Sequence, residues 1–162
     1  MGGRVAPDGL DALAQAELVR TGQVTPAELL DDTIDRVGKT NPAINAVVTT
    51  MYDEARATLA APLPEGPFTG VPFLLKDGGG VAYAGVPMTS ASRFLADYVP
   101  DRDGELTRRY KAAGLVVCGK TNLPEFGLQP TTFDRLTSLL DPARHDRRSR
   151  LPQAEADHLA AA

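Results

Sequence analysis

Apolar positions near the start of the chain recur every three to four residues, which is the spacing of one helix face. Asp8 stands before this repeat as a candidate N-cap, and Gly22 follows it as a candidate stop. The pattern predicts a first helix whose apolar face holds Leu10, Leu13, Ala14 and Leu18.

A second helix is predicted from its start signals. Thr25 suits the N-cap and Pro26 the first helical position, while Glu28, three residues after Thr25, completes a capping box. We expect this helix to end at Gly38, with an apolar stripe formed by Leu30, Ile34 and Val37.

After the second helix the pattern alternates between strands and helices. Runs rich in β-branched or apolar residues predict strands, and segments with helical spacing predict helices. The expected strands are residues 44–50, 71–76 and 115–118, and the expected helices are residues 52–60, 92–98 and 103–113, the last ended by Gly114. This alternation indicates an α/β fold with some parallel strand pairing.

The composition changes after Thr132. The residues that follow contain both histidines and the charged run 144–150, without a sustained helix or strand period. We therefore predict one domain over residues 1–132 and a divergent, poorly ordered tail over residues 133–162.

Composition limits the classes of function. Apolar residues make up 43% and charged residues 23% of the 162 residues, which is typical of a globular domain. The net charge of −4 argues against nucleic acid as a partner. No apolar run approaches the ~20 residues of a membrane span, so we expect no membrane association. The single cysteine excludes an internal disulfide and favours a cytoplasmic location.

Lys76 is the candidate catalytic residue, because it ends the apolar run Val-Pro-Phe-Leu-Leu. A lysine at such a position is usually a solvated strand terminus. If the fold buries it instead, desolvation lowers its pKa and makes the neutral amine available as a base. The glycines at positions 78–80 would let a ligand approach the backbone closely.

Residues 114–121 satisfy the phosphate-binding pattern G-x-x-x-x-G-K-[ST], which makes a nucleotide site an alternative. The context argues against it, because a P-loop follows a strand, whereas residues 115–118 are themselves the predicted strand. Cys118 ends that strand and is expected to be a small buried hydrophobe. His145 and His158 lie in the tail with too little support from other ligands, and we predict no metal and no cofactor.

Four segments, in order and at matching spacing, resemble the amidase signature family. The Gly-Val-Pro-Phe-Leu-Leu-Lys-Asp run at residues 70–77 resembles the family's lysine-bearing strand. The others are Thr-Pro-Ala-Glu-Leu at 25–29 with Ile-Asn-Ala at 44–46, the Thr/Ser loop at 89–95, and the Gly-Lys-Thr-Asn-x-x-Glu-Phe block at 119–126. The resemblance extends from about residue 8 to residue 132.

The resemblance implies the amidase signature fold, a mixed sheet covered by helices, of which this chain holds an incomplete N-terminal part. It also implies hydrolysis of a small-molecule carboxamide through an acyl-enzyme by a Ser-cisSer-Lys triad, without metal or cofactor. Of the three triad residues, only the lysine has a counterpart in the matching segments of this chain, and that counterpart is Lys76. The family's serines follow the Glu-Phe block in glycine-rich segments, whereas Ser138 and Ser149 here have no glycine neighbours. We therefore expect the chain alone to be inactive.

Two further hypotheses follow from this truncation. A non-catalytic member of the family could bind a protein partner, or a second copy of itself, through an unpaired sheet edge. The tail could also result from a frameshift near Thr132. If the arginines of residues 144–148 use CGN codons, reading one base later gives Gly-Thr-Thr-Gly-Gly when G or C fills the free positions.

Overall fold

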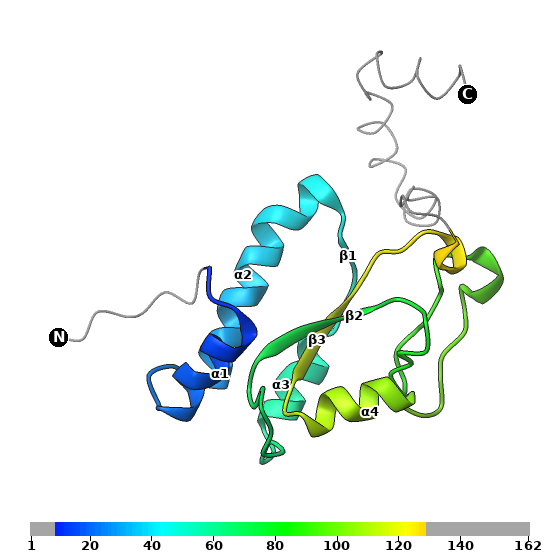
Figure 1. Cartoon of the computed structure of the whole chain (residues 1–162). Helices are drawn as coiled ribbons and strands as arrows, with labels where there is room; N and C mark the ends of the chain where they lie inside the picture. The colour runs from blue at the N-terminus through cyan, green and yellow to red at the C-terminus, as the bar shows by residue number, and fades with distance from the viewer. Residues whose placement is uncertain (1–8, 129–162) are drawn as a thin grey trace.

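The computed structural model of the chain describes residues 9–128, which form a three-stranded sheet with helices packed against it (Figure 1). The strands are β1 (Val47–Thr50), β2 (Pro72–Lys76) and β3 (Val116–Thr121), in the order β1-β3-β2. The central strand β3 is antiparallel to β1 and parallel to β2. The sheet is therefore mixed, and the predicted α/β class with some parallel pairing is confirmed.

The helices of this described part alternate with the strands along the chain. The α-helices are α1 (Ala12–Arg20), α2 (Pro26–Ile44), α3 (Tyr52–Leu59) and α4 (Glu105–Ala112), and two short 3-10 helices are η1 (Arg93–Leu95) and η2 (Glu125–Gly127). Helix α3 packs against β3 and also against α2. No helix within residues 9–128 is long and apolar enough to cross a bilayer.

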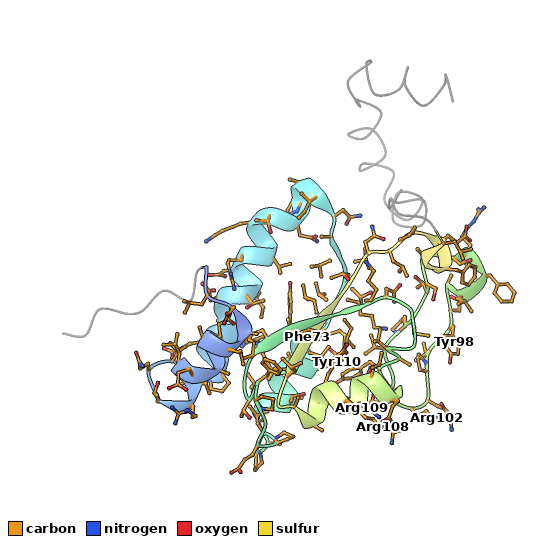
Figure 2. The ribbon with its side chains drawn as sticks, viewed as in Figure 1. Phe73, Tyr98, Arg102, Arg108, Arg109 and Tyr110 are labelled. Carbon is orange, nitrogen blue, oxygen red and sulfur yellow. The ribbon has the colours of Figure 1, made fainter. Side chains whose placement is uncertain are left out.

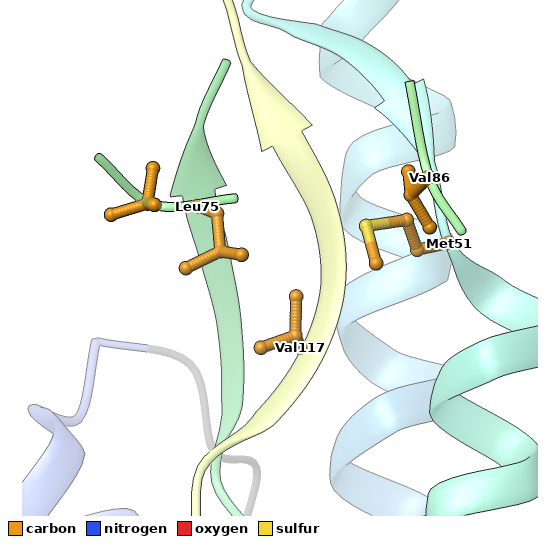
Figure 3. Close-up of a cluster of buried hydrophobic side chains, with 5 residues drawn as sticks. Met51, Leu75, Val86 and Val117 are labelled. Atoms are coloured by element: carbon orange, nitrogen blue, oxygen red, sulfur yellow. The ribbon is translucent and has the colours of Figure 1, made fainter. Parts of the chain in front are cut away.

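The two faces of β3 bury two separate groups of apolar side chains. Val116 and Cys118 pack with Leu30 of α2 and Ala55 of α3. Val117, between them in the sequence, points to the opposite face, because successive strand residues alternate sides. On that face it packs with the buried residues Met51, Leu75, Val81 and Val86 (Figure 3). The sheet is thus covered on both faces.

The second face is closed by aromatic side chains. Phe73 of β2 and Tyr110 of α4 lie with ring centroids 4.9 Å apart and planes at 53° (Figure 2). Such a tilted pair is favourable beyond the apolar area it buries. It fixes α4 against the strand that carries Lys76.

The predicted start of α2 is confirmed and that of α1 is corrected. Thr25 accepts a hydrogen bond from the Glu28 N–H at 3.2 Å, and the Glu28 carboxylate accepts from the Thr25 N–H at 2.9 Å. In α1 the N-cap is Asp11, which accepts from the Ala14 N–H at 2.8 Å. Asp8 lies outside the described residues.

The predicted end of α2 at Gly38 is wrong, because the helix continues to Ile44. A glycine inside a helix costs only about 1 kcal/mol, which contacts elsewhere can offset. The side chain of Asn41 supplies such contacts, since it exchanges hydrogen bonds of 2.8 and 2.7 Å with the backbone of Val47. This link also explains why β1 starts at Val47 rather than at residue 44.

The last predicted strand is longer than expected, and its preceding turn is confirmed. Gly114 follows α4 with φ of +88°, and a Cβ there would stand 2.5 Å from the Thr69 Cα, so only glycine fits. The strand predicted over residues 115–118 continues to Thr121. The helix predicted over residues 92–98 is reduced to η1.

Candidate functional site

The carboxyl ends of the parallel strands β2 and β3 lie side by side. Leu75 is paired with Lys120, and Lys76 is paired with Thr121. In sheets with parallel strands, ligand sites typically form where the carboxyl ends of the strands meet. This end of the sheet therefore carries both lysines that the sequence motifs contain, Lys76 and Lys120.

Lys76 is exposed at the end of β2 within the described structure. Within residues 9–128 it is therefore a solvated strand terminus, the usual environment for a lysine at such a position, and the buried alternative is not found there. Alternation along the strand gives the physical reason, because Leu75 and Asp77 on either side of it are 1% and 2% exposed and point into the protein. The side chain between them must point the other way.

Lys120 is the buried lysine, and sequence reasoning missed it. Its side chain is fully buried, with Nζ donating a hydrogen bond of 2.5 Å to the Pro87 carbonyl oxygen and lying 3.7 Å from Asp77 Oδ1. Desolvation lowers the pKa of Lys120, and the charge of Asp77 opposes that shift. The available signal was its position: it directly follows the apolar run Leu-Val-Val-Cys-Gly of a central strand.

Asp77 is held by a second partner besides Lys120. Its two carboxylate oxygens lie 3.3 and 3.2 Å from the Thr89 N–H, and the Thr89 hydroxyl donates to Oδ2 at 2.6 Å. A buried carboxylate with both a cation and two donors is fully compensated. The cluster of Asp77, Thr89 and Lys120 thus joins both strand ends to the loop that contains Thr89.

The backbone of this loop is strained and held in place by Asp77. Ser90 and Ala91 have φ of +49° and +53°, which non-glycine residues rarely adopt. The Ser90 N–H donates to the Asp77 carbonyl oxygen at 3.0 Å. A Cβ on Gly78 would stand 2.9 Å from Ser90 Oγ and 3.0 Å from Leu123 Cδ1, so a larger residue there would displace these side chains.

Glu125 connects η2 to η1. The Ser92 hydroxyl donates to Glu125 Oε1 at 2.8 Å, and the Phe126 N–H donates to the Ser90 carbonyl oxygen at 2.9 Å. The sequence left the role of Glu125 open, because its partner lies 33 residues earlier in the chain. It holds the two 3-10 helices together beside the strand ends.

The alternative phosphate-binding loop is excluded by the conformation of residues 114–121. Val116–Thr121 is the central strand, and the Lys120 ammonium is buried against Asp77 and Pro87. Cys118 is a buried free cysteine as expected, and burial raises the pKa of its thiol to about 11. A thiol of that pKa is a poor nucleophile at neutral pH. Within residues 9–128 no cluster of three metal-ligating side chains occurs.

A hollow of about 730 Å³ lies between α1 and the turn at residues 65–69. Val19 and Arg20 of α1 and Pro67 of the turn contribute to its lining. None of the residues at the strand ends lines it, so it is separate from the Lys76 region.

Comparison with known proteins agrees with the four sequence segments. Residues 28–143 match the family model for amidases. The 6-aminohexanoate-cyclic-dimer hydrolase of Paenarthrobacter ureafaciens is 45% identical over 123 residues, which are 75% of this chain and 24% of that protein. A glutamyl-tRNA(Gln) amidotransferase component from Halothermothrix orenii is 34% identical over 116 residues, which are 72% of this chain and 24% of that protein.

Solved structures show the same relationship. A 6-aminohexanoate cyclic dimer hydrolase complexed with substrate superposes with a TM-score of 0.71 at 45% identity, over 77% of this chain and 26% of that chain. A bacterial aryl acylamidase of the amidase signature family superposes with a TM-score of 0.68 at 31% identity, over 78% and 28% of the two chains. The described sheet and helices are therefore part of the amidase signature fold.

The chain spans about a quarter of the length of the curated relatives it matches. The matched family model covers most of the chain itself, and the matched solved structures share its mixed sheet. On this evidence the chain belongs to the amidase family.

Proposed function

We propose that this chain is the lysine-bearing part of an amidase that hydrolyses a carboxamide C–N bond, and that Lys76 is its catalytic base. The observation that carries the proposal is the position of Lys76. It ends a strand parallel to the central strand, at the sheet end where ligand sites form. The amidase match includes this strand.

In the proposed reaction the neutral Lys76 amine accepts a proton from a bridging serine, which takes one from the nucleophilic serine as that serine attacks the amide carbonyl. The amine product leaves with a proton returned through the same relay, and water then hydrolyses the acyl-serine. Both serines belong to the part of the family domain that follows the Glu-Phe block. Asp77, Thr89 and Lys120 keep the strand end in place.

A chimera tests the role of Lys76. The aligned 123 residues of this chain would replace the equivalent segment of the Paenarthrobacter ureafaciens hydrolase, which is feasible at 45% identity. We expect the chimera to hydrolyse the cyclic dimer. Lys76→Ala should lower kcat at least ~1,000-fold, because members of a triad act as a unit.

Lys39→Ala is the matched control, because Lys39 is also exposed but lies on α2, away from the strand ends. It should leave kcat unchanged. Circular dichroism of all variants confirms that they fold. A folded Lys76→Ala chimera with the kcat of the parent chimera would disprove the proposed role of Lys76.

We propose further that the 162-residue chain alone has no amidase turnover. Ser90 is joined to the residue after Lys76, because its N–H donates to the Asp77 carbonyl oxygen, and it is only 8% exposed. A panel of aliphatic and aromatic amides should give no product. Turnover that disappears in both Lys76→Ala and Ser90→Ala would instead show that Ser90 has become the nucleophile.

The remaining expectations on partners and location are also proposals. Strands β1 and β2 are the edges of the described sheet, which favours association of the isolated chain with other copies of itself. The single described cysteine is a free buried thiol, which suits the reducing cytoplasm.

A further inference from the structure

Asp77, the residue directly after Lys76, has both of its backbone polar groups bonded. Its N–H donates to the Thr121 carbonyl oxygen at 3.0 Å, and its carbonyl oxygen accepts from the Ser90 N–H at 3.0 Å. The first of these bonds fixes the peptide plane between Lys76 and Asp77, because that plane contains the Asp77 N–H. The direction in which the Lys76 side chain leaves the strand therefore depends on how firmly Asp77 is held.

The buried side chain of Asp77 provides this hold. The Thr89 hydroxyl donates to its Oδ2 at 2.6 Å, and Lys120 Nζ lies 3.7 Å from its Oδ1. A buried carboxylate stays ionised only when a cation and hydrogen-bond donors compensate for the lost water. Lys120, which is itself fully buried, supplies the positive charge. Without that charge the Asp77 carboxylate would take up a proton or turn toward water, and either change weakens the hold.

The chain after Asp77 has no side chain that could replace this hold. Residues 78–80 are all glycine, and Gly79 and Gly80 are exposed with φ of +74° and +84°. Glycine has the widest backbone freedom and no side chain to pack. The Asp77 side chain is therefore the last anchor of the strand that carries Lys76 before a segment of three glycines.

A catalytic base is sensitive to such a hold, because a displacement of about 1 Å can lower the rate ~100-fold. Lys120 is paired with Leu75 and points to the face of the sheet opposite the Lys76 side chain. It can therefore influence Lys76 only through the Asp77 carboxylate and the backbone between them. Its effect on the rate would require no contact with the substrate.

We propose that Lys120 is a positioning residue for amide hydrolysis: by holding the Asp77 carboxylate, it fixes the backbone that carries Lys76. This inference rests on the proposed role of Lys76 as the catalytic base. It gives Lys120 a part in turnover beyond its contribution to stability, because release of Asp77 would displace the base even in a molecule that stays folded.

Hydrogen exchange of the full 162-residue chain measures the hold directly. In Lys120→Met the Asp77 N–H should exchange at least ~10-fold faster relative to the Val116 N–H, which is bonded to the Val71 carbonyl oxygen at the other end of β3. Local release of the strand end raises only the first rate, whereas global unfolding raises both. Leu30→Ala is the matched control, because it removes a fully buried side chain that packs with Val116, and it should not raise this ratio.

Turnover is measured in the chimera with the Paenarthrobacter ureafaciens hydrolase. Lys120→Met should lower kcat about 100-fold and leave KM within about 2-fold, because only the placement of the base changes. Leu30→Ala should leave kcat unchanged, although it also destabilises the fold. Circular dichroism confirms that the variants are folded at the assay temperature.

A second substitution distinguishes positioning from packing. Asp77→Asn removes the buried negative charge and keeps an oxygen that can accept from Thr89. The double variant Lys120→Met/Asp77→Asn should therefore recover kcat at least ~10-fold relative to Lys120→Met. If Lys120→Met does not fold, Asp77→Asn alone carries the test, and it should lower kcat about 10-fold without changing KM.

Several outcomes would overturn the proposal. These are an unchanged exchange ratio or an unchanged kcat in folded Lys120→Met, an equal loss of kcat in Leu30→Ala, and a double variant no more active than Lys120→Met. For Asp77→Asn alone, the kcat of the parent chimera would have the same meaning. Loss of turnover in Lys76→Ala without loss in Lys120→Met refutes the positioning role alone. Full turnover in Lys76→Ala refutes the proposed function itself, so the two failures are distinguishable.

Discussion

Two lysines on neighbouring parallel strands have opposite environments. Lys76 ends β2 with its side chain exposed, whereas Lys120, paired with the residue just before it, is fully buried between Asp77 and Pro87. The strand pairing is the same for both, so the difference comes from which face each side chain points to. Position in a motif therefore does not say which of the two lysines is desolvated.

The difference separates two tasks at the end of the sheet. The Lys120 ammonium has its partners inside the described structure and holds the strand ends and the Thr89 loop together. Lys76 has its side chain exposed at the end of β2. A buried lysine that fixes structure and an exposed lysine can stand one position apart in register, provided that they point to opposite faces of the sheet.

The largest expected effect on stability comes from removing the buried charge. Lys120→Met should lower the free energy of unfolding by about 3–5 kcal/mol, because it leaves the Asp77 carboxylate buried without its cation. Lys76→Met is the matched variant and should change it by less than about 0.5 kcal/mol, since its side chain is exposed. Urea denaturation of the 162-residue chain measures both. Equal losses in the two variants would contradict the contrast.

A double variant sharpens the assignment of that loss to the ion pair. Asp77→Asn keeps an oxygen that can accept from Thr89 but removes the charge facing Lys120. The double variant Lys120→Met/Asp77→Asn should lose about 2 kcal/mol less unfolding free energy than the sum of the losses in the two single variants. Additive losses in the same urea titrations would show that Lys120 acts through packing alone.

A third lysine, Lys111 of α4, should give an effect between those of Lys120 and Lys76. Its Nζ lies 2.6 Å from Asp103 Oδ2 and 3.6 Å from the Tyr83 ring centroid, and its side chain is 35% exposed. Lys111→Met should lower the unfolding free energy by about 0.5–1 kcal/mol. The loss should shrink in concentrated salt, which screens exposed charges.

The same pair predicts a pH dependence. Burial opposes ionisation of Asp103, but hydrogen bonds from Lys111 and the Ala84 N–H and the charges of Lys111 and Arg108 outweigh it and lower its pKa below the ordinary 3.8. A carboxyl with a lowered pKa adds stability above its ordinary pKa and loses it as pH falls through the folded value. The Lys111→Met loss should therefore be full at neutral pH and diminish as the pH falls below 3.8. A loss that is constant with pH would show that the Asp103–Lys111 charge pair is not its source.

The sequence by itself determined the features that depend on neighbouring residues. The Thr25–Glu28 capping box, the alternation of strands with helices and the turn at Gly114 each need only a few adjacent positions, and all were predicted. The burial of Cys118 followed from the apolar run that contains it. The four family segments were also readable, because each is a short run of adjacent residues.

The tertiary structure decided what depends on distant partners. Hydrogen bonds between Asn41 and Val47 stabilise the part of α2 beyond Gly38. Ser92 binds the Glu125 carboxylate. Asp77 and Pro87 are the partners of the buried Lys120 ammonium. None of these pairings leaves a local periodic signal, because each joins segments that only folding brings together. The exposure of Lys76 has the same origin: alternation along β2 sets its direction, and whether that direction meets solvent depends on what packs against the end of the sheet.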